Sequence, residues 1–295
     1  MGLTKSQFWL LGIFAAIFTV LTILSYDTFV QNESISADSM EKNKVAPERS
    51  PSFMMRLIPI SGVANRDVLL DISENSTKHI NGSVVIPYTS FTRSAGLLKS
   101  VPEISKILGD AGISSNDSLV VYGECMPCGG GPALATYVYW MMKCLGHENI
   151  QILDGTIEDW SRAGILTTNK SAVRPITKYT SKFTSEFIAS YPYVKSDKAQ
   201  IVDARPSLEF NTSSIPEAMN IPYDSVLDNR SIKNETALKN VFYRLDRNRP
   251  VVVFTDTGIK ASVMWFALEL MGYEAKLYSW QDWLINQIPA DNVSA

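Results

Sequence analysis

The residues of this sequence whose types and spacing could carry out chemistry are Cys125 and Cys128, which form a C-x-x-C pair. Three glycines follow at once, Gly129, Gly130 and Gly131. Glycines adopt positive φ angles readily, so consecutive backbone N–H groups can turn toward one point and stabilise a thiolate or an anion there. We therefore predict that Cys128 is a nucleophile, that Cys125 is its helper thiol, and that the three glycines bind the substrate.

The segments on either side of these residues would place them in a loop before a helix. Leu119–Tyr122 is a short apolar run that contains β-branched residues, as in a fully buried strand. From Leu134 apolar residues continue at helical density until Gly146, a residue type favoured just after a helix. The positive end of a helix dipole lowers the pKa of a nearby thiol, which favours its reactive thiolate form.

Three interpretations of the cysteine pair remain open from the sequence. Cys128 could carry sulfur as a persulfide with Cys125 as a resolving or helper thiol, or the pair could be a reversible thiol–disulfide couple. In the third interpretation the pair forms an inert structural disulfide in a catalytically inactive protein that is used only for binding. The third cysteine, Cys144, lies on the apolar helix and is expected in the core. His79 and His147 are far along the chain from the pair, so we expect no metal, and we expect no cofactor.

The chain alternates short β-branched runs with helical patterns, which is typical of α/β units on a parallel sheet. The same order of elements occurs twice, and the second copy follows a polar stretch from Thr167 to Thr184. Phe254 repeats Tyr122 at an offset of 132, whereas Gly272 repeats Gly146 at an offset of 126. The cysteine loop of the first copy is therefore predicted to be six residues longer than its counterpart.

Each copy contains a series of short motifs, and the corresponding motifs follow the same order in the two copies. They are His79-Ile80-x-Gly82, Leu108-Gly109-x-x-Gly112-Ile113, Val120-Val121-Tyr122-Gly123, Gly146-His147 and Ile152-Leu153-Asp154-Gly155 in the first, and Val202-Asp203-Ala204-Arg205, Pro250–Phe254, Gly258-x-Lys260 and Leu270–Tyr273 in the second. Together they resemble the tandem rhodanese-like sulfurtransferases over about residues 54–288. The resemblance implies two tandem α/β domains, each a mostly parallel sheet flanked by helices. It also implies transfer of sulfane sulfur from a thiosulfate- or mercaptopyruvate-type anion to a thiol acceptor through a cysteine persulfide.

In that family the persulfide cysteine normally opens a loop C-x-x-G-x-[RK] in the second domain. Here the loop keeps Gly258 and Lys260, but Thr255 replaces the cysteine and Asp256 adds negative charge. A hydroxyl group cannot form a persulfide, so this loop is predicted to be silent. Cys128 lies one residue before the family's nucleophile position, and its role therefore rests on physical chemistry rather than on the resemblance.

Three further polar residues of the two copies are expected to have structural roles. His79 precedes a predicted strand and should be structural, and Arg205 should form an internal ion pair with Asp203. His147 follows a helix end and is expected to cap the helix carbonyls or to interact with the dipole.

The N-terminus contains a candidate membrane span. Residues 7–26 are uncharged and mostly apolar, and about 20 such residues span a bilayer as a helix. We predict that residues 1–26 are a transmembrane signal anchor, with a cleaved signal peptide as the alternative. Lys5 lies before the span, while Asp27 and Glu33 lie after it. This asymmetry favours a single-pass protein with its N-terminus inside and its domains outside the cytoplasm.

N-x-[ST] triplets begin at nine asparagines, whereas chance would give roughly three. The excess favours a glycosylated exterior, although Asn, Ser and Thr also share surface loops without glycans. The main candidates are Asn75, Asn81, Asn116, Asn211 and Asn234, and the remaining triplets begin at Asn32, Asn169, Asn229 and Asn292.

The composition of the 295 residues fits two globular domains, because 45% are apolar and 19% are charged. A net charge of −3 without a basic cluster gives no reason to expect a nucleic-acid partner. The expected partners are a small sulfur-donor anion, a thiol acceptor and, through the N-terminal helix, a membrane. The predicted organisation is an anchor at 1–26, a flexible tether at 27–53, a first domain at 54–168, a linker at 169–184, a second domain at 185–288 and a tail at 289–295.

Overall fold

The structure is a computed structural model that describes residues 50, 53, 55–64, 67–74, 76–93, 97–125 and 130–287. The predicted anchor, most of the predicted tether and the predicted tail lie outside these residues, as do Asn75, Cys128 and Gly129. Within the described residues, no helix combines the length and the apolar character that a bilayer crossing requires.

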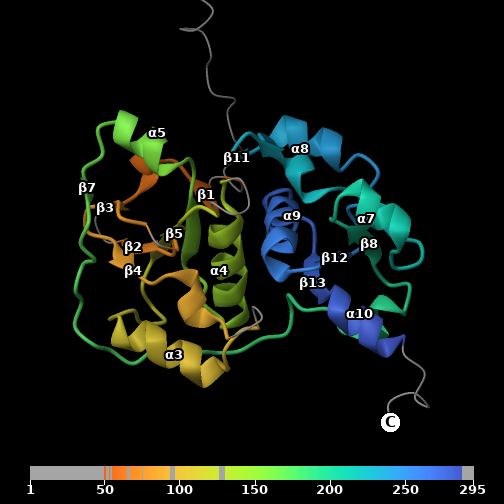
Figure 1. The fold of residues 1–295 in the computed structure, drawn as a ribbon, viewed down its shortest axis with the longest axis horizontal. Helices are drawn as coiled ribbons and strands as arrows, with labels where there is room; N and C mark the ends of the chain where they lie inside the picture. The colour runs from red at the N-terminus through yellow and green to blue at the C-terminus, as the bar shows by residue number, and fades with distance from the viewer. Residues whose placement is uncertain are drawn as a thin grey trace, which may run out of the picture. The chain divides into compact units, whose positions relative to one another are not determined.

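The first half of the described chain is built on a parallel five-stranded sheet with the strand order β1-β6-β5-β2-β4 (Figure 1). The strands are β1 (Leu57–Ile58), β2 (Val68–Asp71), β4 (Val84–Val85), β5 (Leu119–Tyr122) and β6 (Ile150–Leu153). The helices are η1 (Ile60–Gly62), η2 (Tyr88–Phe91), α3 (Val101–Asp110), α4 (Ala133–Cys144) and α5 (Ile157–Arg162). A separate antiparallel pair joins β3 (His79–Ile80) to β7 (Thr167–Thr168).

The second half repeats this plan with a parallel four-stranded sheet in the order β13-β12-β8-β9. Its strands are β8 (Gln200–Asp203), β9 (Met219–Asn220), β12 (Val251–Thr255) and β13 (Ala275–Ser279), with a hairpin of β10 (Leu227–Asp228) and β11 (Ser231–Ile232) beside them. Its helices are α6 (Tyr191–Val194), α7 (Ser207–Thr212), η5 (Tyr223–Val226), α8 (Glu235–Val241), α9 (Gly258–Leu270) and α10 (Trp280–Asn286). A single parallel bridge from Ile188 to Leu277 takes the place of β1. The predicted duplication is therefore confirmed, and so is the fold class of two α/β sheets flanked by helices.

The central strands are apolar at successive positions because both faces of each sheet are covered. Side chains of a strand alternate between the two faces, and β5 shows this directly. Leu119 and Val121 belong to the main core, whereas Val120 and Tyr122 belong to a smaller cluster that also contains Trp160 of α5. In β12, Val253 faces the main core while Phe254 faces a cluster with Trp280 and Trp283.

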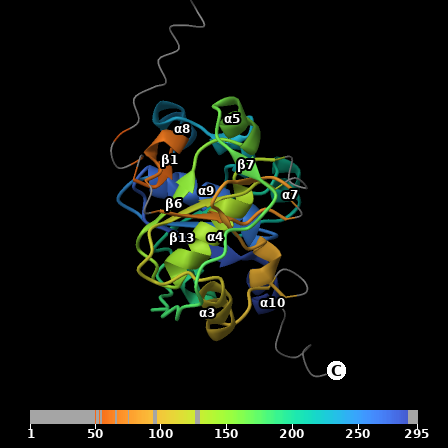
Figure 2. The same cartoon turned by 90° about the vertical axis from the view of Figure 1, so that its left-hand side faces the viewer.

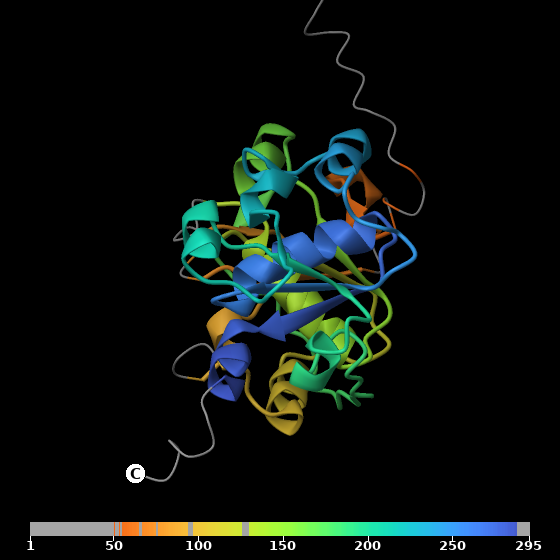
Figure 3. The same ribbon diagram turned by 90° about the vertical axis from the view of Figure 1, so that its right-hand side faces the viewer.

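Helices α4 and α9 join the two halves. Helix α4 packs on β5 and β6, α9 packs on β12 and β13, and the two helices pack on each other in the centre of the molecule (Figure 1). Figure 2 views this arrangement from the side of the first sheet and Figure 3 from the side of the second. Buried side chains of both helices, among them Val138 and Trp265, form one continuous hydrophobic cluster. The two helices that follow the two predicted loops are thus held side by side.

Helix α3 begins at Val101, because Ser100 caps it and the Glu103 carboxylate accepts a hydrogen bond of 2.8 Å from the Ser100 N–H. These hydrogen bonds and the nearby Arg93 lower the pKa of Glu103 to about 2. The polar linker begins with β7, and residues 169–184 after it contain no helix or strand, as expected of a linker.

Candidate functional site

The cysteine loop is confirmed as the longer of the two. Residues 123–132 separate β5 from α4, whereas only residues 256–257 separate β12 from α9. The ends of the long loop are tied by backbone hydrogen bonds: the Cys125 N–H donates to the Gly131 carbonyl over 3.3 Å, and the Gly130 N–H donates to the Cys125 carbonyl over 2.8 Å. Gly130 and Gly131 have φ angles of 87° and 86°, which glycine adopts without strain. The loop is therefore closed at the point where α4 begins.

The three cysteines occupy different environments. Cys125 is 4% exposed and disulfide-bonded, and Cys128 lies outside the described residues. Cys144 is free and buried on α4, where burial raises the pKa of its thiol to about 12. The prediction of a core role for Cys144 is confirmed, and a thiol of that pKa is unreactive at neutral pH.

An arginine from the second half lies against the cysteine loop, and no local sequence pattern predicts this contact. Arg230 lies in the turn between β10 and β11, and its guanidinium pairs with Glu124 in the loop, with the Arg230 Nε 3.0 Å from a Glu124 carboxylate oxygen. Arg230 Nη2 also lies 3.1 Å from the Glu158 carboxylate. A Cβ atom on Gly130 would lie 2.7 Å from Arg230 Nε, so only glycine permits this approach. A small cavity of about 160 Å³ adjoins the loop and is lined by Glu124, Glu158 and neighbouring residues.

The second loop has the predicted residues but not the geometry of an anion site. The Thr255 hydroxyl donates a hydrogen bond to the Thr257 carbonyl inside the loop, and Thr255 is 4% exposed. The Lys260 ammonium lies 5.1 Å from the centre of the Tyr223 ring. Asp256 is half exposed, and its carboxylate lies 3.7 Å from a guanidinium nitrogen of Arg205.

A cleft between the two halves opens at this second loop. Its volume is about 720 Å³, and Thr255, Asp256 and Gly258 form part of its wall. The first half contributes Leu97, Leu98, Tyr137 and Trp140 to the lining, and the second half contributes Ile188–Pro192, Leu277–Ser279, Asp282 and Asn286. The ring of Tyr137 lies against Gly258, because a Cβ atom there would be 3.3 Å from Tyr137 Cε2.

A buried aspartate ends the strand beside the loop strand in each half. In the second half, Asp203 accepts two hydrogen bonds from the Arg205 guanidinium, at 3.0 and 2.7 Å, so the predicted internal ion pair is confirmed. Arg205 is 4% exposed and stacks at 4.2 Å on the Trp280 ring. In the first half, Asp71 instead bonds the His79 ring over 2.8 Å. Both partners are buried, and the structural role predicted for His79 is confirmed.

His147 has a different role from the one predicted. Its backbone N–H donates to the Met142 carbonyl and so helps to end α4, but its ring does not cap helix carbonyls. The two ring nitrogens lie 3.1 Å from the Tyr179 hydroxyl and 3.0 Å from the Asp117 carbonyl oxygen. Burial lowers the pKa of His147, so the neutral ring is the stable form near pH 7.

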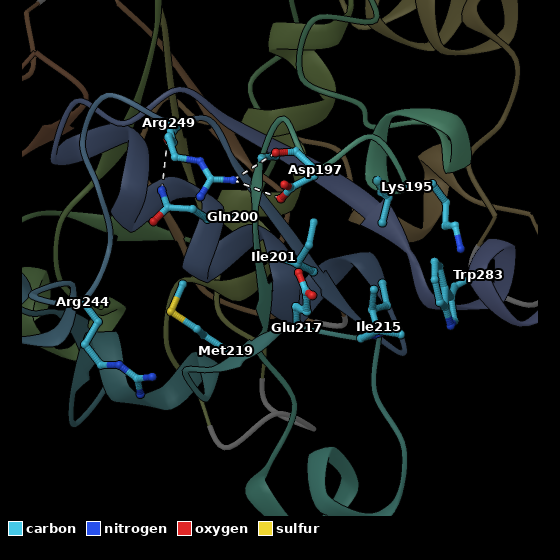
Figure 4. A pocket seen from close by; sticks show the side chains of 13 residues that line it. Lys195, Asp197, Gln200, Ile201, Ile215, Glu217, Met219, Arg244, Arg249 and Trp283 are labelled. Carbon is cyan, nitrogen blue, oxygen red and sulfur yellow. Dashed lines mark hydrogen bonds and ion pairs between the residues drawn. The ribbon is translucent and has the colours of Figure 1, made fainter.

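A third cavity, drawn in Figure 4, lies away from both loops at the amino end of β8. Its volume is about 500 Å³, and Arg249 points across it to Asp197, with 3.4 Å between guanidinium and carboxylate. Arg249 and Asp197 thus partner each other, and no cysteine, serine or threonine is among the described residues that line the cavity. Among the described residues, no group of three or more His, Cys, Asp or Glu side chains is arranged to hold a metal ion.

Among the described glycosylation candidates, the asparagines differ in exposure. Asn81, Asn116 and Asn211 are exposed. Asn234 is partly buried and caps α8, because its side-chain oxygen accepts a hydrogen bond of 2.9 Å from the Ala237 N–H.

Two α/β halves, each with a loop between a central strand and the following helix, define a class of tandem domain proteins. The Rhodanese-like domain family model matches residues 62–163 and 193–285, so the chain belongs to the rhodanese-like family and contains the domain twice.

The curated relatives are sulfurtransferases by name. The 3-mercaptopyruvate sulfurtransferase of Escherichia coli K12 is 25% identical over 229 residues, covering 70% of this chain and 80% of that protein. A Mycobacterium tuberculosis H37Rv protein with the provisional name thiosulfate sulfurtransferase is 25% identical over 270 residues, covering 81% and 89%. Among solved structures, the 3-mercaptopyruvate sulfotransferase SseA from Escherichia coli superposes with a TM-score of 0.62 at 22% identity, covering 73% of this chain and 93% of that one. Wild-type EanB superposes with a TM-score of 0.69 at 17% identity, covering 84% and 72%.

Proposed function

We propose that this protein is a sulfurtransferase that moves sulfane sulfur through a persulfide on Cys128 in the first-half loop. The observation that carries the proposal is the difference between the two loops. The second loop has Thr255, a hydroxyl bonded within its own loop, at the position where the family has its nucleophile. The first loop has cysteines, is tied to the start of α4 and belongs to a chain whose named relatives are sulfurtransferases.

In the proposed reaction, the Cys128 thiolate attacks the outer sulfur of thiosulfate. The new S–S bond forms as the old one breaks, and sulfite leaves with the electron pair of the broken bond. A thiolate acceptor then attacks the outer sulfur of the persulfide, gains that sulfur and returns Cys128 to the thiolate. No external oxidant or reductant is needed when a thiolate acceptor takes the sulfur directly from Cys128. The positive end of the α4 dipole would stabilise the thiolate, whereas the Gly130 N–H is already used in its hydrogen bond to the Cys125 carbonyl.

In this proposal Cys125 can also act as a resolving thiol. A Cys125 thiolate that attacks the inner sulfur of the Cys128 persulfide would form a Cys125–Cys128 disulfide and release hydrosulfide. An external dithiol would then reduce this disulfide before the next turnover. The disulfide-bonded state of Cys125 supports this role, because a resolving thiol alternates between thiol and disulfide.

The test is sulfite release from thiosulfate by the full chain after reduction, with glutathione as the acceptor. Cys128→Ser should reduce the rate to background, whereas Cys125→Ser should keep turnover and accumulate a persulfide that mass spectrometry detects as one added sulfur. Cys144→Ser is the matched control and should leave the rate unchanged. Full activity in Cys128→Ser would refute the proposal.

A second candidate is a thiol–disulfide redox protein, which the disulfide at Cys125 favours. This function needs both thiols, so Cys125→Ser and Cys128→Ser would each abolish disulfide reduction in a model substrate such as insulin. The sulfurtransferase keeps activity in Cys125→Ser. The single Cys125→Ser variant therefore separates the two functions.

We further propose that residues 1–26 anchor the protein in a membrane with both domains on the extracytoplasmic side. The apolar segment at 7–26, the acidic residues after it and the excess of sequons support this topology. Protease added to intact cells should digest the domains, and glycosidase treatment should lower the apparent mass if Asn81, Asn116 or Asn211 carries a glycan. Complete protection from the protease would contradict the topology.

A further inference from the structure

The cleft at the second loop has no cysteine among its described lining residues, yet it is the largest of the cavities described above. Its volume of about 720 Å³ is in the range of sites that bind small organic molecules. It lies between the halves, because Tyr137 and Trp140 of α4, Gly258 of α9, and Asp282 and Asn286 of α10 all line it. The cleft does not include the cysteine loop, so its function can be examined independently of sulfur transfer.

Aromatic side chains form much of the cleft lining. Tyr137 and Trp140 come from α4, and their rings stack with centroids 5.9 Å apart. Tyr191 and Tyr278 line the side formed by the second half. Trp140 Nε1 donates a hydrogen bond of 3.1 Å to the Phe187 carbonyl, which fixes the position of the indole. Aromatic faces carry partial negative charge and attract cations.

The charged residues in the lining are all acidic. Asp256 and Asp282 are the charged side chains among the described lining residues, and none of those residues is Lys, Arg or His. Asp282 is held by the Tyr278 hydroxyl, which donates to its carboxylate over 2.7 Å. The hydrogen bond with Asp256 raises the pKa of the neighbouring Glu209, as expected in a region of negative potential.

The positive groups near the loop are directed elsewhere. The Arg205 charge is shared between Asp203 and Asp256, and Lys260 lies over Tyr223 outside the cleft lining. The start of α9 supplies about half a positive charge, which the full negative charge of Asp256 outweighs. An anion such as thiosulfate would thus meet carboxylates here, and a cation would meet complementary charge.

We propose that the cleft binds a small organic cation of the quaternary ammonium type, with the cationic group against the aromatic rings and near Asp256. Aromatic side chains attract such cations through their faces, and a carboxylate adds a favourable charge. The site is a binding site and not a catalytic one, because Thr255 cannot form a covalent sulfur intermediate. Occupation of the cleft would bridge α4 of the first half and α10 of the second.

The experiment titrates choline into the full chain by isothermal calorimetry at low salt and compares it with 3,3-dimethyl-1-butanol, its neutral carbon isostere. Choline should bind at least about fivefold more tightly than the isostere. Asp256→Asn and Tyr191→Leu should each lower the choline affinity by at least about threefold. The control Asp197→Asn removes an exposed carboxylate at the opposite end of the sheet and should leave the affinity unchanged.

Two outcomes would overturn the proposal. Equal affinities for choline and its isostere would show that the cationic charge is not recognised. Tighter binding of thiosulfate than of choline, weakened by Tyr191→Leu, would make the cleft an anion site. Because Asp256 is half exposed, Asp256→Asn should fold normally, and a cooperative thermal transition will verify this. Sulfite release at the first loop should be unaffected by Asp256→Asn, which separates this proposal from the sulfurtransferase proposal.

Discussion

The two loops occupy equivalent places in the two halves but have opposite surroundings. The β10–β11 hairpin of the second half brings Arg230 against Gly130 and Glu124, and a cavity of about 160 Å³ lies beside the described part of the cysteine loop. Leu97 and Leu98 of the first half lie at the second loop, where the cleft holds about 720 Å³.

The described part of the cysteine loop adjoins a cavity of about 160 Å³, whereas the threonine loop opens on a cleft of about 720 Å³ that has no cysteine among its described lining residues. The two buried aspartates also differ in their partners, since Asp203 pairs with Arg205 and Asp71 pairs with His79. The comparison can be tested by making one half resemble the other.

The largest expected effect concerns the two buried aspartates. Asp203→Asn leaves the buried Arg205 without its closest carboxylate and should lower the free energy of unfolding by about 3–5 kcal/mol. Asp71→Asn should cost only about 1–3 kcal/mol, because it weakens a buried hydrogen bond to the His79 ring and leaves no guanidinium without its carboxylate. Urea unfolding at neutral pH measures both changes. Equal losses in the two variants would show that the two aspartates are equivalent despite their different partners.

The next effect is a gain of chemistry at the second loop. In a Cys128→Ser background, Thr255→Cys should raise sulfite release from thiosulfate only slightly above background, because it restores a thiol nucleophile while Asp256 still repels the anionic donor. Adding Asp256→Gly should raise the rate again by removing the charge that repels the donor. The matched control is Thr257→Cys in the same background, which should remain at background. No gain with either change would mean that the second loop has lost its binding of the anionic donor as well as the thiol.

A smaller effect tests the contact of Arg230 with the first loop. Gly130→Ala adds a Cβ atom 2.7 Å from Arg230 Nε and forces alanine to adopt a φ of 87°. Gly164→Ala, with a φ of 81° and no atom within 4 Å of its Cβ, shares only the backbone cost of about 1–2 kcal/mol. Thermal unfolding should show a greater loss for Gly130→Ala.

The double variant Gly130→Ala/Arg230→Ala is the control for this contact. It should be less destabilised than the sum of the single variants, because the steric conflict disappears with the arginine. Additive losses of stability would mean that Gly130→Ala destabilises the protein only through its backbone conformation.

The smallest effect is a pH dependence confined to the first half. Burial lowers the pKa of folded His147, so the unfolded chain, with a pKa near 6.5, takes up the proton first. The neutral His147 ring therefore makes its full contribution to the free energy of unfolding above about pH 6.5. This contribution decreases as the pH falls toward the pKa of folded His147, by at most about 1.4 kcal/mol per pH unit. His147→Gln should flatten this slope between pH 7 and pH 5 in thermal melts. The second half has Tyr273 at this position in place of a histidine.

The sequence alone determined the elements whose signal is local. The central strand Leu119–Tyr122 was predicted with the same bounds as in the structure, because strands buried on both faces require unbroken apolar runs. The repeated order of motifs predicted the duplication, the longer cysteine loop and the absence of a nucleophile at Thr255. Short strands such as β1 and β9 have two residues each and carry no periodic signal, so they are defined only by their pairing partners.

Only the tertiary structure decided what surrounds each loop. Glu124 and Arg230 are separated by 106 residues, and nothing in either local sequence indicates that they pair. The cleft likewise depends on Trp140 and Tyr278 being brought together by the packing of α4 on α9. Local patterns report which face of an element is buried, because burial selects for apolar side chains at a fixed period. They do not report which distant element covers that face, since that choice depends on the relative position of the two sheets.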